Sequence, residues 1–254
     1  MKKIVFLLLL LSGFQGYSQL KSKSYFITLD KNMSPVSDQN LAVYFIHVFK
    51  TAEGLWQFDH YNFAGPRRAT ESFKDEDMQI PHGFFAYYNS NGTLDSCGNV
   101  YEKKKDGRWT YYDAATGKVL QIKHYDKGTH IRTQQFDLNP KVDSAEEKSK
   151  PLFLKVEVES EFPGGINAWV KYLNKKLEYP TRAYDLRIGG MVSILFIVDI
   201  EGRVTEPVLA QSVEYSLDEE ALRIIRTSPN WTPAMQDGRK VKSYKKQPIV
   251  FKFQ

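Results

Sequence analysis

The 254-residue sequence has very little cysteine, since Cys97 is the only one. A single cysteine cannot form an intrachain disulfide or supply a cysteine cluster for a metal ion, and its simplest interpretation is a small buried apolar residue. None of the five histidines lies in a metal-binding or nucleophile motif, and no catalytic constellation is present. We therefore expect a protein that is not an enzyme and that uses neither a metal nor a cofactor.

Neither sign of charge dominates the sequence. There are 35 basic and 30 acidic residues, which leaves a net charge of +5. The excess is small and interspersed, so it does not indicate nucleic acid as a partner. The hydrophobic content of 42% and the aromatic content of 14% are sufficient for packed cores, and the length is compatible with two domains.

The N-terminal apolar run, residues 4–14, is too short to cross a bilayer, which takes roughly 20 residues. It follows Lys2 and Lys3, and the small residues Gly16 and Ser18 stand three and one positions before Gln19. This pattern predicts a secretory signal peptide over 1–18, cleaved after Ser18. An N-terminal segment retained as an anchor is the alternative.

The last hundred residues predict alternating helices and strands. Residues 181–187 form a short helical run, and Gly189 with Gly190 ends it. Ser216 and Glu219 have the spacing of a capping box, so a helix is expected to begin there and to stop before Pro229. An earlier amphipathic helix is expected over 166–176. Strands are expected at 155–161, 191–200, 203–213 and 248–253.

The order of the last three strands in their sheet follows from their composition. Residues 191–200 are apolar on both alternating faces, as in a central strand. Pro207 cannot donate to a ladder, so the strand over 203–213 is expected at one edge. The terminal strand then lies at the other edge, unpaired on one side. The fold class predicted for this region is α+β, a three-stranded antiparallel sheet with helices on one face. Its open edge must either be covered or bind an extended peptide.

The N-terminal half predicts an all-β domain of repeated antiparallel hairpins. Strands are expected at 25–29, 41–49 and 55–63. The run from Gly83 to Tyr88 is repeated 24 residues later from Gly107 to Tyr112, and glycine turns follow at Gly92 and Gly117. One hairpin cannot bury its aromatic residues alone, so the units are expected to stack. This repeat resembles the MORN-like repeats of the YwqK family, which are generally interaction surfaces.

The region between the two halves is charged and lacks aromatic residues. It predicts a linker with modest reach. The predicted division of the chain is a signal peptide over 1–18, a β-hairpin repeat domain over 19–136, a linker over 137–151 and a C-terminal domain over 152–254.

The C-terminal region resembles the TonB C-terminal domain. The motifs that carry the resemblance occur in the family's order, and the lead-in at 162–165 is similar to that of TonB-like proteins of Bacteroidetes. These motifs are Tyr179-Pro180, Arg182-Ala183, Leu186-Arg187, Gly189-Gly190, Val198-Asp199, Gly202-Arg203-Val204, Trp231-Thr232-Pro233-Ala234, Gly238 and Pro248-Ile249-Val250-Phe251.

The resemblance implies a periplasmic module that grips the TonB box of an outer-membrane transporter by β-strand addition. It also implies force transmission from an inner-membrane proton-driven complex. The partner-binding residues implied are Tyr179, Pro180 and Arg182 together with the terminal strand residues Ile249, Val250, Phe251, Lys252 and Phe253.

Two functions remain open at this point. A TonB has an uncleaved transmembrane anchor, and none is evident in this sequence. That departure favours a non-transducing envelope scaffold, which would bind partner proteins or peptidoglycan through the β repeats. A homodimer is a further possibility for either function.

Several side chains have a structural and a functional interpretation, and the structural one is favoured for each. The repeat aromatics are expected to be core before they are a ligand platform. The carboxylates at 75–77 are expected in a solvated turn, Trp231 is expected to plug the C-terminal core, and His60 and His124 are expected to hold structural positions. The basic residues flanking the terminal strand are expected to form a solvated rim, with an acidic-partner patch as the alternative: Arg239, Lys240, Lys242, Lys245 and Lys246.

Overall fold

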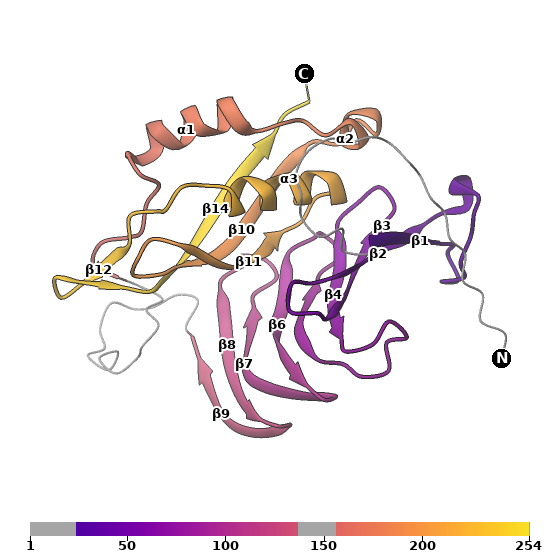
Figure 1. Cartoon of the computed structure of the whole chain (residues 1–254), viewed down its shortest axis with the longest axis horizontal. Helices are drawn as coiled ribbons and strands as arrows, with labels where there is room; N and C mark the ends of the chain where they lie inside the picture. The colour runs from indigo at the N-terminus through magenta and orange to yellow at the C-terminus, as the bar shows by residue number, and fades with distance from the viewer. Residues whose placement is uncertain (1–23, 137–155, 254) are drawn as a thin grey trace.

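The structure, a computed structural model, describes residues 24–136 and 156–253. The predicted signal peptide and linker lie outside these residues. Two sheets account for most of the described chain, one of nine strands and one of three, with a small two-stranded ribbon beside the second. Figure 1 shows the curved nine-stranded sheet below the three-stranded sheet, and the helix α1 on the far side of the latter. Within the described ranges no helix is long and apolar enough to cross a membrane.

The nine-stranded sheet is a simple antiparallel meander, in which each strand pairs with the next one in the sequence. The two predicted repeat hairpins are present as β5 with β6 and β7 with β8. Its strands are β1 (Ser24–Leu29), β2 (Tyr44–Lys50), β3 (Trp56–Asn62), β4 (Arg67–Phe73), β5 (Gly83–Tyr88), β6 (Leu94–Tyr101), β7 (Lys104–Tyr112), β8 (Val119–Asp126) and β9 (Thr129–Gln135).

Three features of this sheet differ from the sequence prediction. The strand expected from residue 41 begins at Tyr44, because the preceding residues form the 3₁₀ turn η1 (Gln39–Leu41), where the Asp38 carboxylate accepts from the Asn40 N–H. Strands β4 and β9 were not predicted. Both are polar in sequence, and they form because neighbouring strands offer them unpaired edges.

One face of the nine-stranded sheet has an aromatic core of its own. Val48, Phe58, Phe73, Phe85 and Trp109 are buried there, although every residue of the cluster belongs to the sheet itself. The repeat aromatics Phe84, Tyr88 and Tyr112 lie on the opposite face by strand alternation. Of the repeat aromatics predicted to be mostly core, Trp109 is buried, Tyr88 and Tyr111 are partly buried against the two cores, and Tyr87 is 36% exposed.

The C-terminal sheet has the strand order β11-β10-β14, all antiparallel. The apolar strand is therefore central, and the strand that contains Pro207 lies at an edge, as predicted. Strand β14 is longer than predicted, because its polar first half continues the pairing with β10. The elements are α1 (Gly165–Lys176), α2 (Thr181–Asp185), β10 (Gly190–Val198), β11 (Val204–Gln211), α3 (Tyr215–Arg226) and β14 (Ser243–Phe251).

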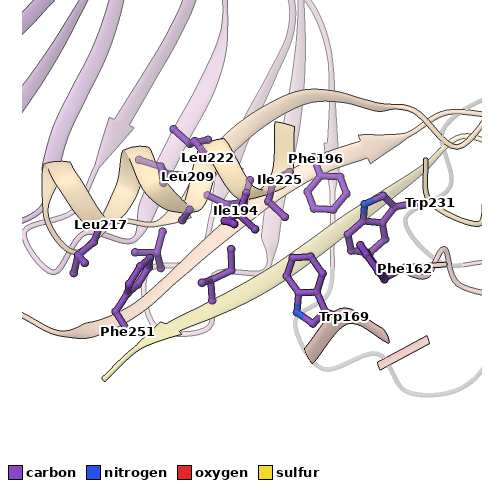
Figure 2. Close-up of a cluster of buried hydrophobic side chains, with 14 of the residues drawn as sticks. Phe162, Trp169, Ile194, Phe196, Leu209, Leu217, Leu222, Ile225, Trp231 and Phe251 are labelled. Atoms are coloured by element: carbon purple, nitrogen blue, oxygen red, sulfur yellow. The ribbon is translucent and has the colours of Figure 1, made fainter. Parts of the chain in front are cut away.

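The helices pack on one face of the three-stranded sheet. Ile194 and Phe196 of β10 contact side chains of α1 and α3, which include Trp169 and Ile225 (Figure 2). Trp231 is buried in the same cluster at 3% exposure, and its indole N–H donates to Ser228 Oγ at 3.0 Å. The predicted role of Trp231 as a plug of this core agrees with that position.

The start of α3 differs from the predicted capping box. The N-cap is Glu214, whose carboxylate accepts from both the backbone N–H and the hydroxyl of Ser216. The Asp218 side chain in the first turn of α3 accepts from the N–H of Val213, which precedes the N-cap, at 3.0 Å. The predicted capping box of Ser216 with Glu219 was therefore wrong, because the helix has its N-cap two residues earlier than Ser216. Glutamate is an uncommon N-cap residue, so sequence preference pointed to the serine.

The segment before α1 is not the strand predicted over 155–161. From residue 156 onward it forms only isolated bridges, Val158 with Met235 and Glu161 with Thr232. Its partner is the ribbon of β12 (Ala234–Gln236) and β13 (Arg239–Val241), which was not predicted.

A buried polar cluster joins the two sheets. The Arg67 guanidinium of β4 lies 3.3 Å from Asp59 of β3 and 3.3 Å from Glu219 of α3. Tyr61 accepts from Arg67 Nε at 2.7 Å and donates to Asp218 at 3.2 Å. One guanidinium thus lies among three carboxylates at the contact between the N-terminal sheet and α3.

Candidate functional site

The outer edge of β14 is the candidate site, because no strand of the described chain pairs with it. Its inner edge pairs with β10 over nine residue pairs, from Gly190 opposite Phe251 to Val198 opposite Ser243. The free edge therefore presents a row of backbone N–H and C=O groups about nine residues long.

The opposite edge of the sheet is partly occupied by the N-terminal sheet. The Ser212 N–H donates to the Gly92 carbonyl at 2.9 Å, and Gln211 forms a bridge with Thr93. Gln211 Nε2 also donates to the Asn91 carbonyl at 2.7 Å. The turn of the first repeat hairpin thus contacts the end of β11. The N-terminal sheet also reaches β14 through side chains, because Arg108 of β7 donates to the Tyr244 hydroxyl and lies 5.2 Å from the centre of the Tyr244 ring. No strand of the described chain pairs with the outer backbone edge of β14.

The side chains of β14 divide between the core and the surface. Ile249 and Phe251 are buried against the helices. Val250 is 51% exposed on the other face, and Lys252 and Phe253 are exposed beyond the end of the strand. Of the predicted site residues in this strand, Ile249 and Phe251 have their side chains in the core and offer a partner no side-chain contact.

An aromatic group lies beside the C-terminal end of β14. The Tyr179 ring is 6.1 Å from Phe251 and 6.4 Å from Phe253, and Tyr184 of α2 is 5.3 Å from Phe253. The Tyr179 hydroxyl donates to the Ile188 carbonyl at 2.6 Å, which fixes its ring. This group combines the predicted residue Tyr179 with the terminal strand.

Arg182 and Pro180 have structural partners in this fold. Arg182 Nε donates to the buried carboxylate of Glu214 at 2.6 Å, and its Nη2 donates to the Phe63 carbonyl. The guanidinium also lies over the rings of Phe45 and Phe63. Pro180 is the N-cap residue of α2. The contacts of Arg182 therefore place it between α2 and the N-terminal sheet, apart from the free edge of β14.

The basic residues form a rim near the start of β14. Arg239 and Lys240 are exposed on β13, and Lys246 is exposed on β14. The structure records no ion pair for these three side chains. On β14 itself, the exposed side chain is basic in the first half, at Lys246, and apolar in the second half, at Val250.

Two apolar or aromatic residues of this site were missed by sequence reasoning. Tyr184 is 57% exposed beside Phe253, and Met191 is 50% exposed opposite Val250. Met191 belongs to an apolar strand in which both faces were expected to be buried. The exposure of Met191 follows from the observed sheet, in which no helix of the described chain covers the face that carries Met191 and Val250 at this end of β10 and β14.

The remaining candidate side chains have local partners. His60 lies 3.5 Å from Glu71, and no group of three or more metal-binding side chains occurs in residues 24–136 and 156–253. Asp75 accepts from the backbone N–H groups of Gln79 and Ile80, so it holds a turn. Burial raises the pKa of the Cys97 thiol to about 11, which makes it a poor nucleophile.

The fold and the edge together define an α+β module with one sheet edge available for pairing. Residues 175–253 match the family described as the Gram-negative bacterial TonB protein C-terminal domain. This C-terminal part of the chain is therefore similar to the C-terminal domain of TonB proteins, whose family consists of energy-transducing transport adaptors, and the match does not extend to the nine-stranded sheet. No curated protein and no solved structure matched the chain.

Proposed function

We propose that this protein is a periplasmic adaptor that binds the TonB box of an outer-membrane transporter by adding it as a strand to β14. The observation that carries the proposal is the free edge of β14 in a domain of this family. Strand addition draws its affinity from main-chain hydrogen bonds, which are specific in geometry and tolerant in sequence.

The surroundings of the edge support an extended peptide as the ligand. Val250 and Met191 form an exposed apolar pair on one face of the sheet, and Tyr184 with Phe253 forms an exposed aromatic pair beside the other. Alternate side chains of an added strand would meet these two surfaces in turn.

Titration of the isotopically labelled protein with a synthetic TonB-box peptide tests this function. We expect backbone amide signals of 246–253 to shift, with Val250 among the largest. The control is the same peptide with alternate backbone nitrogens methylated, which removes the donors of one edge. Unchanged amide signals along β14 at saturating peptide would contradict strand addition.

A second candidate function is favoured by the aromatic face of the nine-stranded sheet. Lys105 Nζ lies 4.0 Å from the centre of the Trp109 ring, and Tyr111 accepts a hydrogen bond from the same amine at 2.9 Å. Tyr87 is 36% exposed on this face. A face of this kind suits a scaffold that binds envelope proteins or peptidoglycan. Co-sedimentation of the full chain with peptidoglycan, without any peptide response in β14, would favour the scaffold.

A further inference from the structure

Pro248 lies in the middle of the free edge strand. The pairing of β14 with β10 runs through it without a break, and Pro248 lies opposite Ser193. In an antiparallel ladder, residues alternate between those whose N–H and C=O both face the partner and those whose groups both face away. A proline has no N–H to donate, so an unbroken ladder requires Pro248 to be one of the residues that face away.

This assignment determines the whole outer row. Tyr244, Lys246 and Val250 have the same parity as Pro248, so their N–H and C=O groups also point away from β10. The Pro248 carbonyl accepts a hydrogen bond from Nε2 of the preceding residue, Gln247, at 3.3 Å, as expected for a carbonyl that does not bond to β10. The free edge therefore has a carbonyl at each of the four positions, of which that of Pro248 also accepts from Gln247, and it lacks one donor at Pro248.

The missing donor affects two kinds of partner differently. If a second copy of the chain paired its β14 with this one about a two-fold axis, each copy would contribute a Pro248, and two hydrogen bonds would be missing. A strand of different sequence loses only one. Each net hydrogen bond changes an association constant by roughly threefold to tenfold. The edge is therefore biased against pairing with itself.

Charge adds to the same bias. Lys246 is exposed on the outer face of the strand. In a symmetric antiparallel pair centred on this residue, it would lie directly opposite its own copy, and like charges at such positions are destabilising. Shifting the register removes this repulsion but keeps both prolines in the ladder.

We propose that Pro248 selects the partner of the β14 edge: it disfavours a second copy of this chain and admits a heterologous extended peptide. The residue of that peptide opposite Pro248 leaves its own carbonyl to water. This inference rests on the proposed strand-addition function for its peptide arm, whereas the exclusion of a second copy stands without it.

The test compares Pro248→Val with the wild-type full chain and with Gln247→Val. Both variants introduce a β-branched residue into β14, but only Pro248→Val adds an outward N–H donor. Valine is apolar, as proline is, so this substitution does not change the polarity of the side chain at position 248. Analytical ultracentrifugation measures self-association, and titration with the TonB-box peptide measures binding. Thermal midpoints verify that each variant is folded.

We expect Pro248→Val to increase the self-association constant by about tenfold to a hundredfold, because two donors are restored. Peptide affinity should increase by only about threefold to tenfold, because one donor is restored. Gln247→Val should change both constants much less, because it adds no donor and only releases the Pro248 carbonyl from its side-chain bond. If folded Pro248→Val self-associates no more than Gln247→Val, the inference is overturned, even where the peptide binds. If Pro248→Val dimerises while no variant binds the peptide, the proposed function fails and the self-exclusion stands.

Discussion

At the scale of single residues, the contact between the two sheets depends on a crowded set of charges. Arg67 is 5% exposed and Asp218 is fully buried, and both hydrogen bond to Tyr61. Asp218 also accepts from Ser212 Oγ at 2.5 Å and from the Val213 N–H. Desolvation by burial raises the pKa of Asp218 to about 7, and the nearby Arg67 only partly offsets this.

The raised pKa of Asp218 predicts a pH-dependent stability. Between pH 4 and pH 7 the folded state holds a proton that the unfolded chain has released, so the free energy of unfolding falls as pH rises through this window. A shift from 3.8 to about 7 corresponds to at most about 4 kcal/mol. Asp218→Asn should remove most of this slope, as measured by urea unfolding at pH 5 and pH 7.5.

Other groups titrate in the same range, so the wild type alone does not isolate Asp218. Burial raises the pKa of Glu219 and lowers that of His47 to about 4. The matched control is Asp95→Asn, at an exposed position of β6. It should keep the wild-type slope. An Asp218→Asn slope equal to that of Asp95→Asn would contradict the assignment.

The site residues illustrate what a sequence can predict at this scale. Trp231 could be placed in the core because the flanking prolines and the aromatic content of the region agree. The role of Arg182 could not be predicted from its motif, because its partners Phe63 and Phe45 come from the other sheet, more than a hundred residues away. Long-range side-chain contacts of this kind leave no local pattern.

At the scale of elements, the turn of the β5–β6 hairpin packs against the end of β11 and so joins the two sheets by a contact. Gly92 has φ +84°, and a Cβ there would overlap the Ser212 carbonyl oxygen and contact Pro66. The turn can therefore approach β11 only with glycine at this position. The Ser212 N–H donates to the Gly92 carbonyl, which fixes the approach.

Gly92→Ala should therefore loosen the contact between the sheets. We expect a lower thermal midpoint and faster amide exchange at Ser212, since the clash adds to the strain of a positive φ. Gly107→Ala is the control, because Gly107 has φ +63° but a Cβ there would meet nothing within 4 Å. Equal effects of the two substitutions would show that backbone strain alone is responsible.

Element types were easier to predict than element ends. Strand β10 was evident because both of its faces are apolar, and Pro207 correctly indicated an edge. Strand β14 was predicted too short because its first half, which contains Lys245 and Lys246, is stabilised by the pairing with β10 and not by its own composition. The same reason explains why β4, β9 and the β12–β13 ribbon were missed.

At the scale of the whole molecule, the two sheets pack against each other and are not independent domains without contacts (Figure 1). Arg182, Arg67 and the turn at Gly92 all cross between them. The predicted domain boundaries, the linker over 137–151 and cleavage after Ser18 stay predictions, since those segments lie outside the described residues. The N-terminal sheet contacts α2, α3 and β11, and it touches β14 at the Tyr244 side chain. The outer backbone edge of β14 has no strand paired with it among the described residues.

The central claim is that the outward backbone groups of β14 are free and can bind an added strand. Amide hydrogen exchange tests it directly, because neighbouring residues should behave oppositely. Without ligand, we expect the Lys246 and Val250 amides to exchange quickly and the Ile249 and Phe251 amides, bonded to β10, to exchange slowly. With saturating TonB-box peptide, Lys246 and Val250 should slow by at least about tenfold, the effect of roughly 1.4 kcal/mol of added protection. Fast exchange at both residues in the peptide-saturated protein would contradict the account.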